Sequence, residues 1–480
     1  MSRSLHLCRT RSKRLCLVAR AAVLVLACAA IFACNQTDVD RSRTIAVWAM
    51  AGKADHWRAD NVVTAAERLA QSLPEFASLA VQPVNLPGGA ADYKKKFTLA
   101  AEAGRGPDIA VSGHEDIAAW ASAGYIVPLA PSVTQLLERF PELERVHPSL
   151  WPACTWQGQV WAVPQDVEAR PLYFSKTRLH ELGWSDDEIA VLPDRIARGA
   201  YTLDDMIATA REAVARGVVR PGFGFWHRSV IGADHLQFYV AYGGRLYDEA
   251  SDRLVITRSA LVAWLRFQRE AVTSEVTSAT LLGTERRIWQ DTVAHHNVLF
   301  WQAGSWAWVD WAENYVQGEG GGDFLEQTTG YALVPSGIRG QPAATLSHPL
   351  VYMVTQPAIS GQQHQDQSRQ ILAAVTAPDL DARHVVDSAH LSILRQPQLE
   401  QPADENGGDR HAARRRFLDR IGYMLDHNYY LPNHAGYAQY FDVLWENMVA
   451  ATTGNKSPEL AADEAIAELE IELGDALLIE

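Results

Sequence analysis

The segment VWAVPQDVEARPLYFSK, residues 160–176, places three charged side chains between two apolar runs. The first apolar run ends at Pro164, which removes a backbone donor and fixes φ. Asp166, Glu168 and Arg170 follow at alternate positions, so an extended backbone turns all three toward one side. Because apolar residues resume directly afterwards, we expect this trio to line a crevice instead of open surface. Carboxylate acceptors beside a guanidinium donor suit a ligand rich in hydroxyl groups.

The composition is that of a large, folded and acidic protein. Of the 480 residues 48% are hydrophobic, enough for two or more domains of about 100–200 residues each. The formal net charge is −14, and residues 1–33 hold basic residues but no acid, so the rest of the chain is more acidic still. Since no basic stripe offsets the repulsion of phosphates, nucleic acid is not expected as a partner.

The start of the chain resembles an export signal, because a basic stretch is followed by an apolar run that is short for a membrane span. Ala33 before Cys34 resembles the lipobox of bacterial lipoproteins, in which the cysteine becomes the lipid-modified N-terminus. We therefore expect a lipoprotein signal peptide at 1–33, lipidation at Cys34 and a tether at 34–43. An uncleaved anchor helix is the alternative interpretation.

Cysteine usage predicts no intrachain disulfide. Once residues 1–33 are removed and Cys34 carries lipid, Cys154 has no partner. No base lies near it in the sequence, so we interpret Cys154 as a small buried residue.

Strand-like and helix-like segments alternate along the first third of the chain. Strands are expected at 44–48, 79–86 and 107–111, with helices between them, and Asp60 is the expected N-cap of the first helix. This order predicts an open, mainly parallel α/β sheet, whose ligands bind beyond the carboxyl ends of the strands. Later helices are expected at 202–217, where Thr202 and Asp205 imitate a capping box, at 371–389, and at 457–478, where Ser457 caps and Pro458 takes the first turn.

Several short motifs follow one another in an order typical of one family. The chain resembles the family 1 extracellular solute-binding proteins of bacterial ABC importers, over about residues 44–475. The motifs are GPDI at 106–109, AGYIVPL at 123–129, VP at 163–164 with LYFSK at 172–176, AGSW at 303–306, YALVP at 331–335, and TG at 453–454 with SPE at 457–459.

The resemblance implies an α/β fold of the periplasmic binding protein type (class II), with two lobes, ligand held in the cleft between them and several hinge crossovers. The lobes it implies are 44–157 plus 346–395 for lobe 1 and 166–340 plus 410–480 for lobe 2, with crossovers at 158–165, 341–345 and 396–409.

The resemblance also implies a function without covalent chemistry. The protein would capture a carbohydrate, most readily an oligosaccharide, and deliver it to the transmembrane subunits of an ABC permease. It would be an exported monomer, anchored by lipid to the cell membrane and facing the periplasm or the cell exterior. The alternatives are a glycoside hydrolase that uses Glu115 and Glu168 as paired carboxylates, and a sensor subunit for a signalling receptor.

Sugar recognition needs flat aromatic faces for C–H patches and planar polar side chains for hydroxyl groups. By resemblance, Trp306 matches a sugar platform after a Gly-Ser turn, although a buried packing role is the alternative. Glu168 matches a sugar-binding acid, or else forms a plain salt bridge with Arg170. His114, Glu115 and Asp116 follow a strand in a loop that reaches sugar hydroxyls in the family, or else the acids compensate a helix dipole.

Two further pairs complete the candidate ligand-binding residues. Trp226 and His227 lie in an aromatic loop that flanks sugar in the family, and Trp48 and Lys53 follow the first strand in another cleft loop. The acid, proline and aromatic sequence of maltose-type binders is absent here, so the identity of the sugar does not carry over. The sequence shows no redox or nucleotide motif, and adjacent histidines at 295–296 point different ways on a helix, so we expect no cofactor and no metal.

Overall fold

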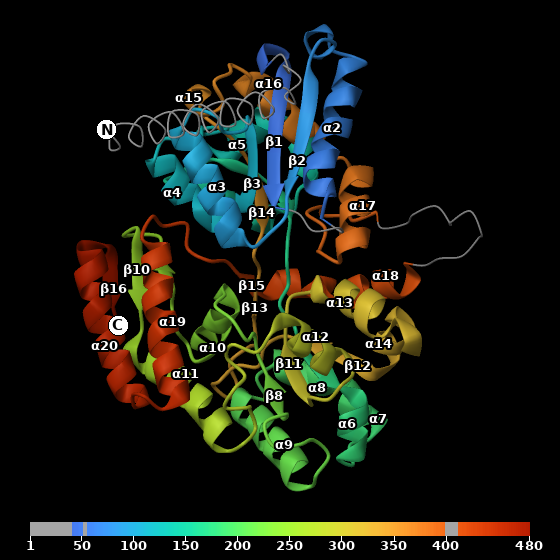
Figure 1. The fold of residues 1–480 in the computed structure, drawn as a ribbon, viewed down its shortest axis with the longest axis vertical. Coiled ribbons are helices and arrows are strands. Elements are labelled where there is room, and N and C mark those ends of the chain that lie inside the picture. The colour runs from blue at the N-terminus through green and yellow to red at the C-terminus, as the bar shows by residue number, and fades with distance from the viewer. Residues whose placement is uncertain (1–40, 51–54, 399–410) are drawn as a thin grey trace, which may run out of the picture. The chain divides into compact units, whose positions relative to one another are not determined.

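The computed structural model describes residues 41–50, 55–398 and 411–480. The sites predicted at Cys34 and Lys53, and most of the expected third crossover, lie outside these ranges. Residues Ile45–Glu480 form one compact unit, to which the contacts below belong (Figure 1). Among the described residues, no helix has the length and apolar character needed to cross a membrane.

A five-stranded sheet with the order β2-β1-β3-β14-β6 contains the strands expected early in the chain. β1 runs parallel to β3, with Val47 opposite Ile109, whereas β14 is antiparallel to both β3 and β6. The sheet is therefore mixed: β1, β3 and β6 run in one direction, and β14, which comes from a distant part of the chain, runs against them. Its strands are β1 (Thr44–Met50), β2 (Ala80–Leu86), β3 (Ile109–Gly113), β6 (Ala162–Asp166) and β14 (Leu350–Val354).

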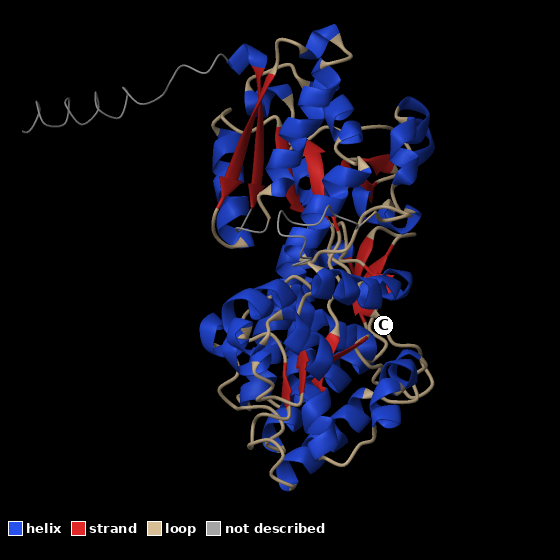
Figure 2. Ribbon diagram, turned by 90° about the vertical axis from the view of Figure 1, so that its right-hand side faces the viewer, coloured by secondary structure: helices blue, strands red, loops and turns tan. Residues whose placement is uncertain are grey.

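Helices flank this first sheet (Figure 2). α2 packs against β2, α16 and α17, and α3 contacts α15. The expected cap at Asp60 is wrong, since α2 begins at Trp57 and the Asp60 carboxylate instead pairs with His56 Nδ1 at 2.7 Å. The helices are α2 (Trp57–Ala70), α3 (Ala90–Glu102), α4 (Ile117–Ser122), α5 (Val133–Arg139), α15 (Pro357–Ser360), α16 (Gln365–Ala374) and α17 (Pro378–Ser388).

A second sheet, of four strands, has the order β12-β7-β11-β8. β7 is antiparallel to β11 and β12, and β11 is parallel to β8. Buried rings fill its core: the ring of Tyr173 lies 5.8 Å from that of Trp301 and 5.0 Å from that of Trp311. Its strands are β7 (Leu172–Ser175), β8 (Phe225–Trp226), β11 (Phe300–Gln302) and β12 (Thr329–Ala332).

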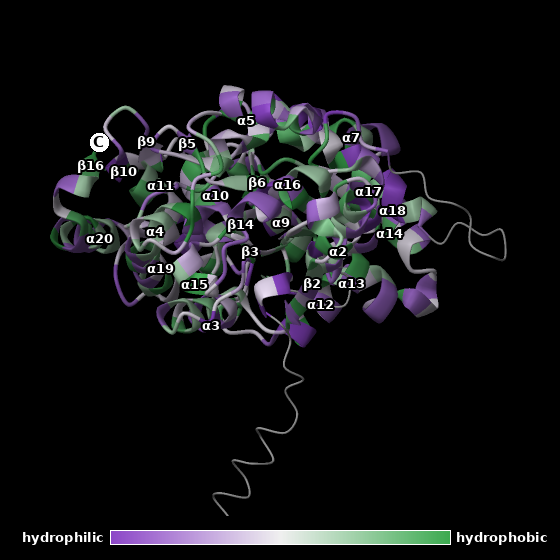
Figure 3. Ribbon diagram, turned by 90° about the horizontal axis from the view of Figure 1, so that it is seen from above, coloured by the Kyte–Doolittle hydropathy of each residue, from purple (hydrophilic) through white to green (hydrophobic). Residues whose placement is uncertain are grey.

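Helices also surround the second sheet, and one of them, α18, is hydrophilic along much of its length (Figure 3). The capping box at Thr202 and Asp205 is confirmed at the start of α9. The helices of this part are α6 (Lys176–Glu181), α7 (Asp186–Ala190), α8 (Leu192–Ala197), α9 (Leu203–Ala215), α10 (Leu236–Ala241), α12 (Arg286–Ala294), α13 (Ala307–Asp310), α14 (Gly322–Thr328) and α18 (Ala412–Ile421).

Three long helices, α11, α19 and α20, pack together beside a small sheet of order β16-β10-β9. Ser457 caps α20 as expected, but the helix ends at Leu473 and not near residue 478. Gly474 ends it with φ +51°, and the apolar residues that follow pair with β10 as strand β16. The elements are α11 (Arg258–Thr273), α19 (Tyr437–Thr453), α20 (Pro458–Leu473), β9 (Tyr247–Asp248), β10 (Arg253–Ile256) and β16 (Leu477–Ile479).

The chain passes from one large sheet to the other at 167–171 and 333–349, and again between α17 and α18. These passages touch: Leu391 N donates to Val167 O at 2.8 Å, and Arg170 N donates to Thr345 Oγ1 at 3.1 Å. The first crossover was expected at 158–165, but residues 162–165 of that range belong to strand β6. The observed passage begins after β6, at residue 167. The lobe boundaries themselves stay a prediction. Two short pairs lie nearby: β4 (Thr155–Trp156) with β5 (Gln159–Val160), and β13 (Thr345–Leu346) with β15 (Asn428–Tyr429).

Candidate ligand-binding site

Arg170, in the first passage between the two large sheets, organises the ion pairs on the side of the second sheet. Its Nη2 donates to Glu168 Oε2 at 2.8 Å and its Nε donates to Asp234 Oδ1 at 2.9 Å. Arg228 Nη1 donates to the other oxygen of Asp234 at 3.2 Å. Arg170, Glu168 and Asp234 are all buried. The alternation that the sequence shows at 166–170 therefore points charged side chains inward, where each carboxylate has a cationic partner.

Glu168 lies among three cationic or basic groups. Besides Arg170, His390 Nε2 is 3.4 Å from Glu168 Oε1, and His348 Nδ1 is 3.6 Å from Glu168 Oε2. Burial alone would raise the pKa of Glu168, but Arg170 and the two histidines hold it well below its usual value. Glu168 is therefore a carboxylate at neutral pH, able to accept hydrogen bonds but not to donate a proton.

Glu115 lies just after β3, in the short 3-10 helix His114–Asp116. Lys94 Nζ is 2.8 Å from Glu115 Oε1, and His348 Nε2 is 2.8 Å from Glu115 Oε2. Burial opposes the charge of His348, but Glu115 and Glu168 outweigh it and raise the pKa of His348 to about 9. His348 is thus protonated at neutral pH and joins Glu115, beside the first sheet, to Glu168 in the passage that leads to the second.

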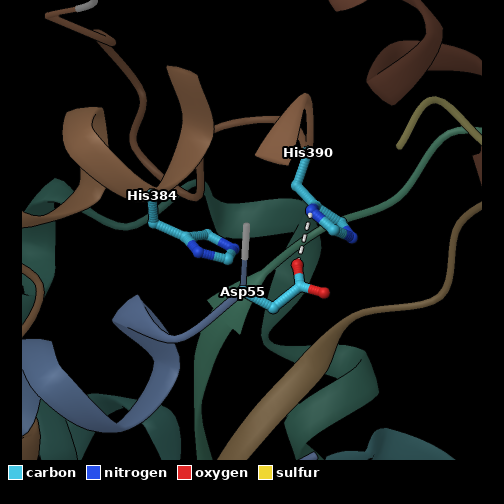
Figure 4. Close-up of side chains that lie close together, drawn as sticks. All are labelled: Asp55, His384 and His390. Atoms are coloured by element: carbon cyan, nitrogen blue, oxygen red, sulfur yellow. Dashed lines mark ion pairs between the residues drawn. The ribbon is translucent and has the colours of Figure 1, made fainter. Parts of the chain in front are cut away.

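A second group of ion pairs surrounds Arg58 on helix α2. Arg58 Nη2 donates to Asp166 Oδ2 at 2.9 Å and lies 3.3 Å from His390 Nε2 and 3.5 Å from Asp55 Oδ1. His384 Nε2 lies 3.0 Å from the same Asp166 oxygen. In Figure 4 the His390 ring stands over the Asp55 carboxylate, with His384 beside it. His390 belongs to both groups, since it also contacts Glu168, so the ion pairs form one connected network.

Two sets of side chains in this network have the residue types of a metal site: Asp55, His384 and His390 in one, and His114, Glu115 and His348 in the other. In each set a cation of the chain already neutralises the carboxylate. Arg58 does so in the first, and Lys94 with the protonated His348 does so in the second. We therefore assign both sets to ion pairing.

Trp306 gives the network an aromatic surface. Its half-buried indole lies 5.1 Å below the Arg170 guanidinium, and its ring is nearly parallel to that of His390, with centroids 6.0 Å apart. Ser305 N donates to Ala169 O at 2.9 Å, which ties this turn to the passage that carries Arg170. A Cβ at Gly304 would lie 1.7 Å from the Trp306 ring, so only glycine leaves room for the indole there.

The structure brings together Glu115, Glu168 and Trp306, which are far apart in the sequence. Two of the other predicted residues, His114 and Asp116, are the sequence neighbours of Glu115 and bond to other parts of the protein. Asp116 accepts a hydrogen bond from Ser112 at 2.6 Å, and His114 Nε2 donates to Leu431 O at 3.1 Å. Burial lowers the pKa of His114 to about 4, so it is neutral. Their ligand-binding roles stay predictions.

Three predicted residues, Trp226, His227 and Trp48, pack against or bond to residues outside the network of ion pairs. Trp226 Nε1 donates to Gly222 O, and its ring packs on Phe223. His227 is buried and packs against rings that include Phe225. Both belong to the core around the second sheet. Trp48 is half-buried in β1 and accepts a hydrogen bond from Tyr93 at its backbone oxygen. The ligand-binding roles of these three residues stay predictions.

Sequence reasoning missed the partners that complete the network: Arg58, Lys94, Asp234, His348, His384 and His390. Only Arg58 left a usable signal. It lies on the face of α2 that also carries Val62 and Ala65, where a charge is unexpected and needs a buried partner. The three histidines belong to no sequence motif. They join the network only through contacts with residues that are distant in the sequence.

Comparison with known proteins gives the family. The family model described as bacterial extracellular solute-binding protein matches residues 78–380. No protein with a curated description matches the chain by sequence. The solved structures that resemble it include the GacH receptor of Streptomyces glaucescens, solved without ligand and with acarbose, at 19% identity and a TM-score of 0.65. That match covers 90% of this chain and 98% of the receptor.

Two other structures are similar to the same degree. Maltose-bound MalE3 of T. maritima has 17% identity and a TM-score of 0.65, covering 89% of this chain and 99% of its own. The cyclic α-maltosyl-1,6-maltose binding protein of Arthrobacter globiformis has 17% identity and a TM-score of 0.64, covering 89% and 98%. These likenesses show the fold, which is the two-lobed α/β fold of periplasmic binding proteins, so the fold class and the family expected from the sequence are confirmed. The chain belongs to the bacterial extracellular solute-binding proteins.

Proposed function

We propose that this chain is the substrate-binding protein of an ABC importer, which captures a carbohydrate and delivers it to a membrane permease. One observation supports this most directly. Glu115, Glu168 and Trp306, from three distant segments, meet in one network that includes Asp166 of the first sheet, the passages between the sheets, and Asp234 near the second. Planar hydrogen-bonding groups next to an aromatic face are what a sugar needs.

The position of the network suits a protein that closes around its ligand. Glu115 follows a strand of the first sheet, Asp234 and Trp306 belong to the surroundings of the second, and Glu168 and His348 lie in two of the passages. A ligand that touches groups from both sides gains its full set of contacts only when they are close together. Its differential affinity then favours the closed conformation, which is the population shift that transport requires.

The electrostatics disfavour the hydrolase alternative. A glycosidase of the common type needs one carboxyl group with a raised pKa to act as general acid. Burial would raise the pKa values of Glu115 and Glu168, but their cationic neighbours hold both well below the usual value. Both groups remain ionised and ion-paired, which suits hydrogen-bond acceptance and does not suit proton donation. We therefore propose binding without turnover.

The leader and the anchor belong to the same proposal. The family is extracellular, which implies export to the periplasm or the cell exterior. We propose that residues 1–33 are removed as a lipoprotein signal peptide and that Cys34 carries the lipid. Growth with a radiolabelled fatty acid should label the wild-type protein and leave a Cys34→Ser variant unlabelled. Equal labelling of the two would rule out this anchor.

The test of binding is a screen of the exported protein against neutral monosaccharides and oligosaccharides. Calorimetry should find at least one that binds, and chromatography of the same mixtures should find each sugar intact. Cleavage products that disappear in a Glu168→Gln variant would replace the transport proposal with the hydrolase. A protein that binds no saccharide in a broad panel would refute carbohydrate capture.

A further inference from the structure

The buried polar groups near the network that have no hydrogen-bond partner include Nη1 of Arg170 and the hydroxyl groups of Tyr429 and Tyr437. Buried polar groups in folded proteins nearly always have partners, because desolvating them without one costs free energy. The other two nitrogens of the Arg170 guanidinium, Nε and Nη2, both donate hydrogen bonds to carboxylates. The fold therefore holds this side chain in place and still leaves Nη1 without a partner.

Backbone pairing places Tyr429 beside Arg170. Strands β13 and β15 pair in parallel, with Leu346 opposite Tyr429 and Thr345 opposite Asn428. Thr345 Oγ1 in turn accepts a hydrogen bond from Arg170 N at 3.1 Å. Burial raises the pKa of Tyr429 well above its usual value, and the charges of Arg170 and Asp234 also act on this phenol. Tyr429 and Arg170 are therefore neighbours on the same side of the network.

Tyr437 faces the same group of charges from the start of α19. It is only 7% exposed. Burial raises its pKa well above the usual value, and Glu115, Arg170, Tyr429 and Asp234 all act on it. The segment between β15 and α19 is fixed against the first sheet, because Leu431 O accepts from His114 and Asn433 Nδ2 donates to Ala153 O at 2.8 Å.

We propose that Nη1 of Arg170 and the hydroxyl groups of Tyr429 and Tyr437 together bind an uncharged, hydroxyl-bearing ligand, and this proposal rests on the function proposed above. A sugar hydroxyl can both accept from Nη1 and donate to a phenol oxygen, so a single ring with adjacent hydroxyl groups can serve all three. Trp306 lies under the same guanidinium and supplies the apolar face that the C–H groups of such a ring need.

Charge pairing in the network explains why the ligand should be neutral. Glu115 is paired with Lys94 and His348, Glu168 with Arg170 and the histidines, and Asp234 with Arg170 and Arg228. Among the described residues of the network, a ligand ammonium group finds no unpaired carboxylate. A ligand carboxylate would have to compete with Glu168 and Asp234 for the single charge of Arg170, and both are buried beside it.

The variants Tyr429→Phe and Tyr437→Phe remove one hydroxyl group each and keep the ring. We expect each to weaken binding of the tightest neutral sugar in a panel of glucose, galactose, maltose and maltotriose by about five- to tenfold in calorimetry. The melting temperature without sugar should stay the same or rise, because no protein hydrogen bond is lost. Tyr440→Phe, in the same helix, is the matched control: its hydroxyl group donates to Val255 O at 2.7 Å, so it should lower the melting temperature and leave the affinity unchanged.

Charged analogues test the second half of the proposal. Glucuronate and glucosamine should bind at least tenfold more weakly than glucose, and glucuronate that binds more tightly would overturn the assignment of a neutral ligand. If the wild-type protein binds a sugar and both tyrosine variants bind it equally well, the two hydroxyl groups are filled by water alone and the inference fails while the proposed function stands. If the wild-type protein binds no sugar, the proposed function fails and this inference falls with it.

Discussion

Replacing His348 with glutamine should remove a stabilisation that depends on pH. In the wild-type protein the imidazolium lies 2.8 Å from Glu115 and 3.6 Å from Glu168, and these carboxylates, against the effect of burial, raise the pKa of His348 from 6.5 to about 9. Glutamine has a similar size and can still donate a hydrogen bond, but it carries no charge at any pH. The variant therefore isolates the charge of this one residue.

The size of the effect follows from the shift of the pKa. A group whose pKa is higher in the folded state than in the unfolded state stabilises the fold while it is protonated in both. For His348 this contribution is fully present below about pH 6.5 and disappears as the pH rises through about 9. A shift of this size corresponds to about 3 kcal/mol at roughly 1.4 kcal/mol per pKa unit.

Urea unfolding of both proteins at several values between pH 5.5 and 10 measures this directly. The free energy of unfolding should be lower for His348→Gln by about 2–3 kcal/mol near pH 6, and the difference should shrink toward zero near pH 10. Taking the difference in unfolding free energy between the two proteins at each pH removes the contribution of the titrating groups that both proteins contain. A difference that stays constant over the whole range would show that His348 acts through its shape or its neutral hydrogen bonds, and the charged bridge would then be wrong.

Three further changes test other parts of the site. Trp306→Ala should weaken sugar binding by about 1–3 kcal/mol in calorimetry with little change in melting temperature, whereas a large loss of melting temperature without sugar would favour a packing role. Gly304→Ala should weaken binding in the same assay, because a Cβ there lies 1.7 Å from the Trp306 ring and must displace it, and an unchanged affinity would contradict the position of the indole. Asp234→Asn leaves the Arg170 charge with only Glu168 as anion, so it should cost about 3 kcal/mol or more in urea unfolding. A loss below about 1 kcal/mol would mean that the pair is solvated.

The sequence predicted local structure well where short-range chemistry controls it. The capping box at Thr202 and Asp205 needs only four consecutive residues and is present. The cap at Asp60 was wrong because a carboxylate within a first turn stabilises a helix as well as one before it, and the pattern does not distinguish the two. The end of α20 was misplaced because an apolar run after Gly474 suits a helix or a strand, and only the presence of β10 decides between them.

The site was predictable in part for a similar reason. Glu168 and Arg170 stand out in one segment, and Trp306 follows a turn that the family motif marks. His348 and His390 lie more than 170 positions away from Glu168 in the sequence, yet the fold brings both within 4 Å of it. No spacing along the chain predicts these contacts.

The place of β14 in the first sheet has a consequence for how the chain acquires its structure. This strand joins β3 to β6, yet it is synthesised more than 180 residues after β6. Until it arrives, β3 and β6 lack the strand that pairs with both of them, so the first sheet is incomplete and has unpaired strand edges. We expect such a polypeptide to complete its first sheet only late in synthesis, which would keep it in a form that a secretion channel can thread. A fragment that stops at residue 340 should accordingly remain soluble only with a chaperone, whereas addition of the next fifteen residues should let the first sheet form.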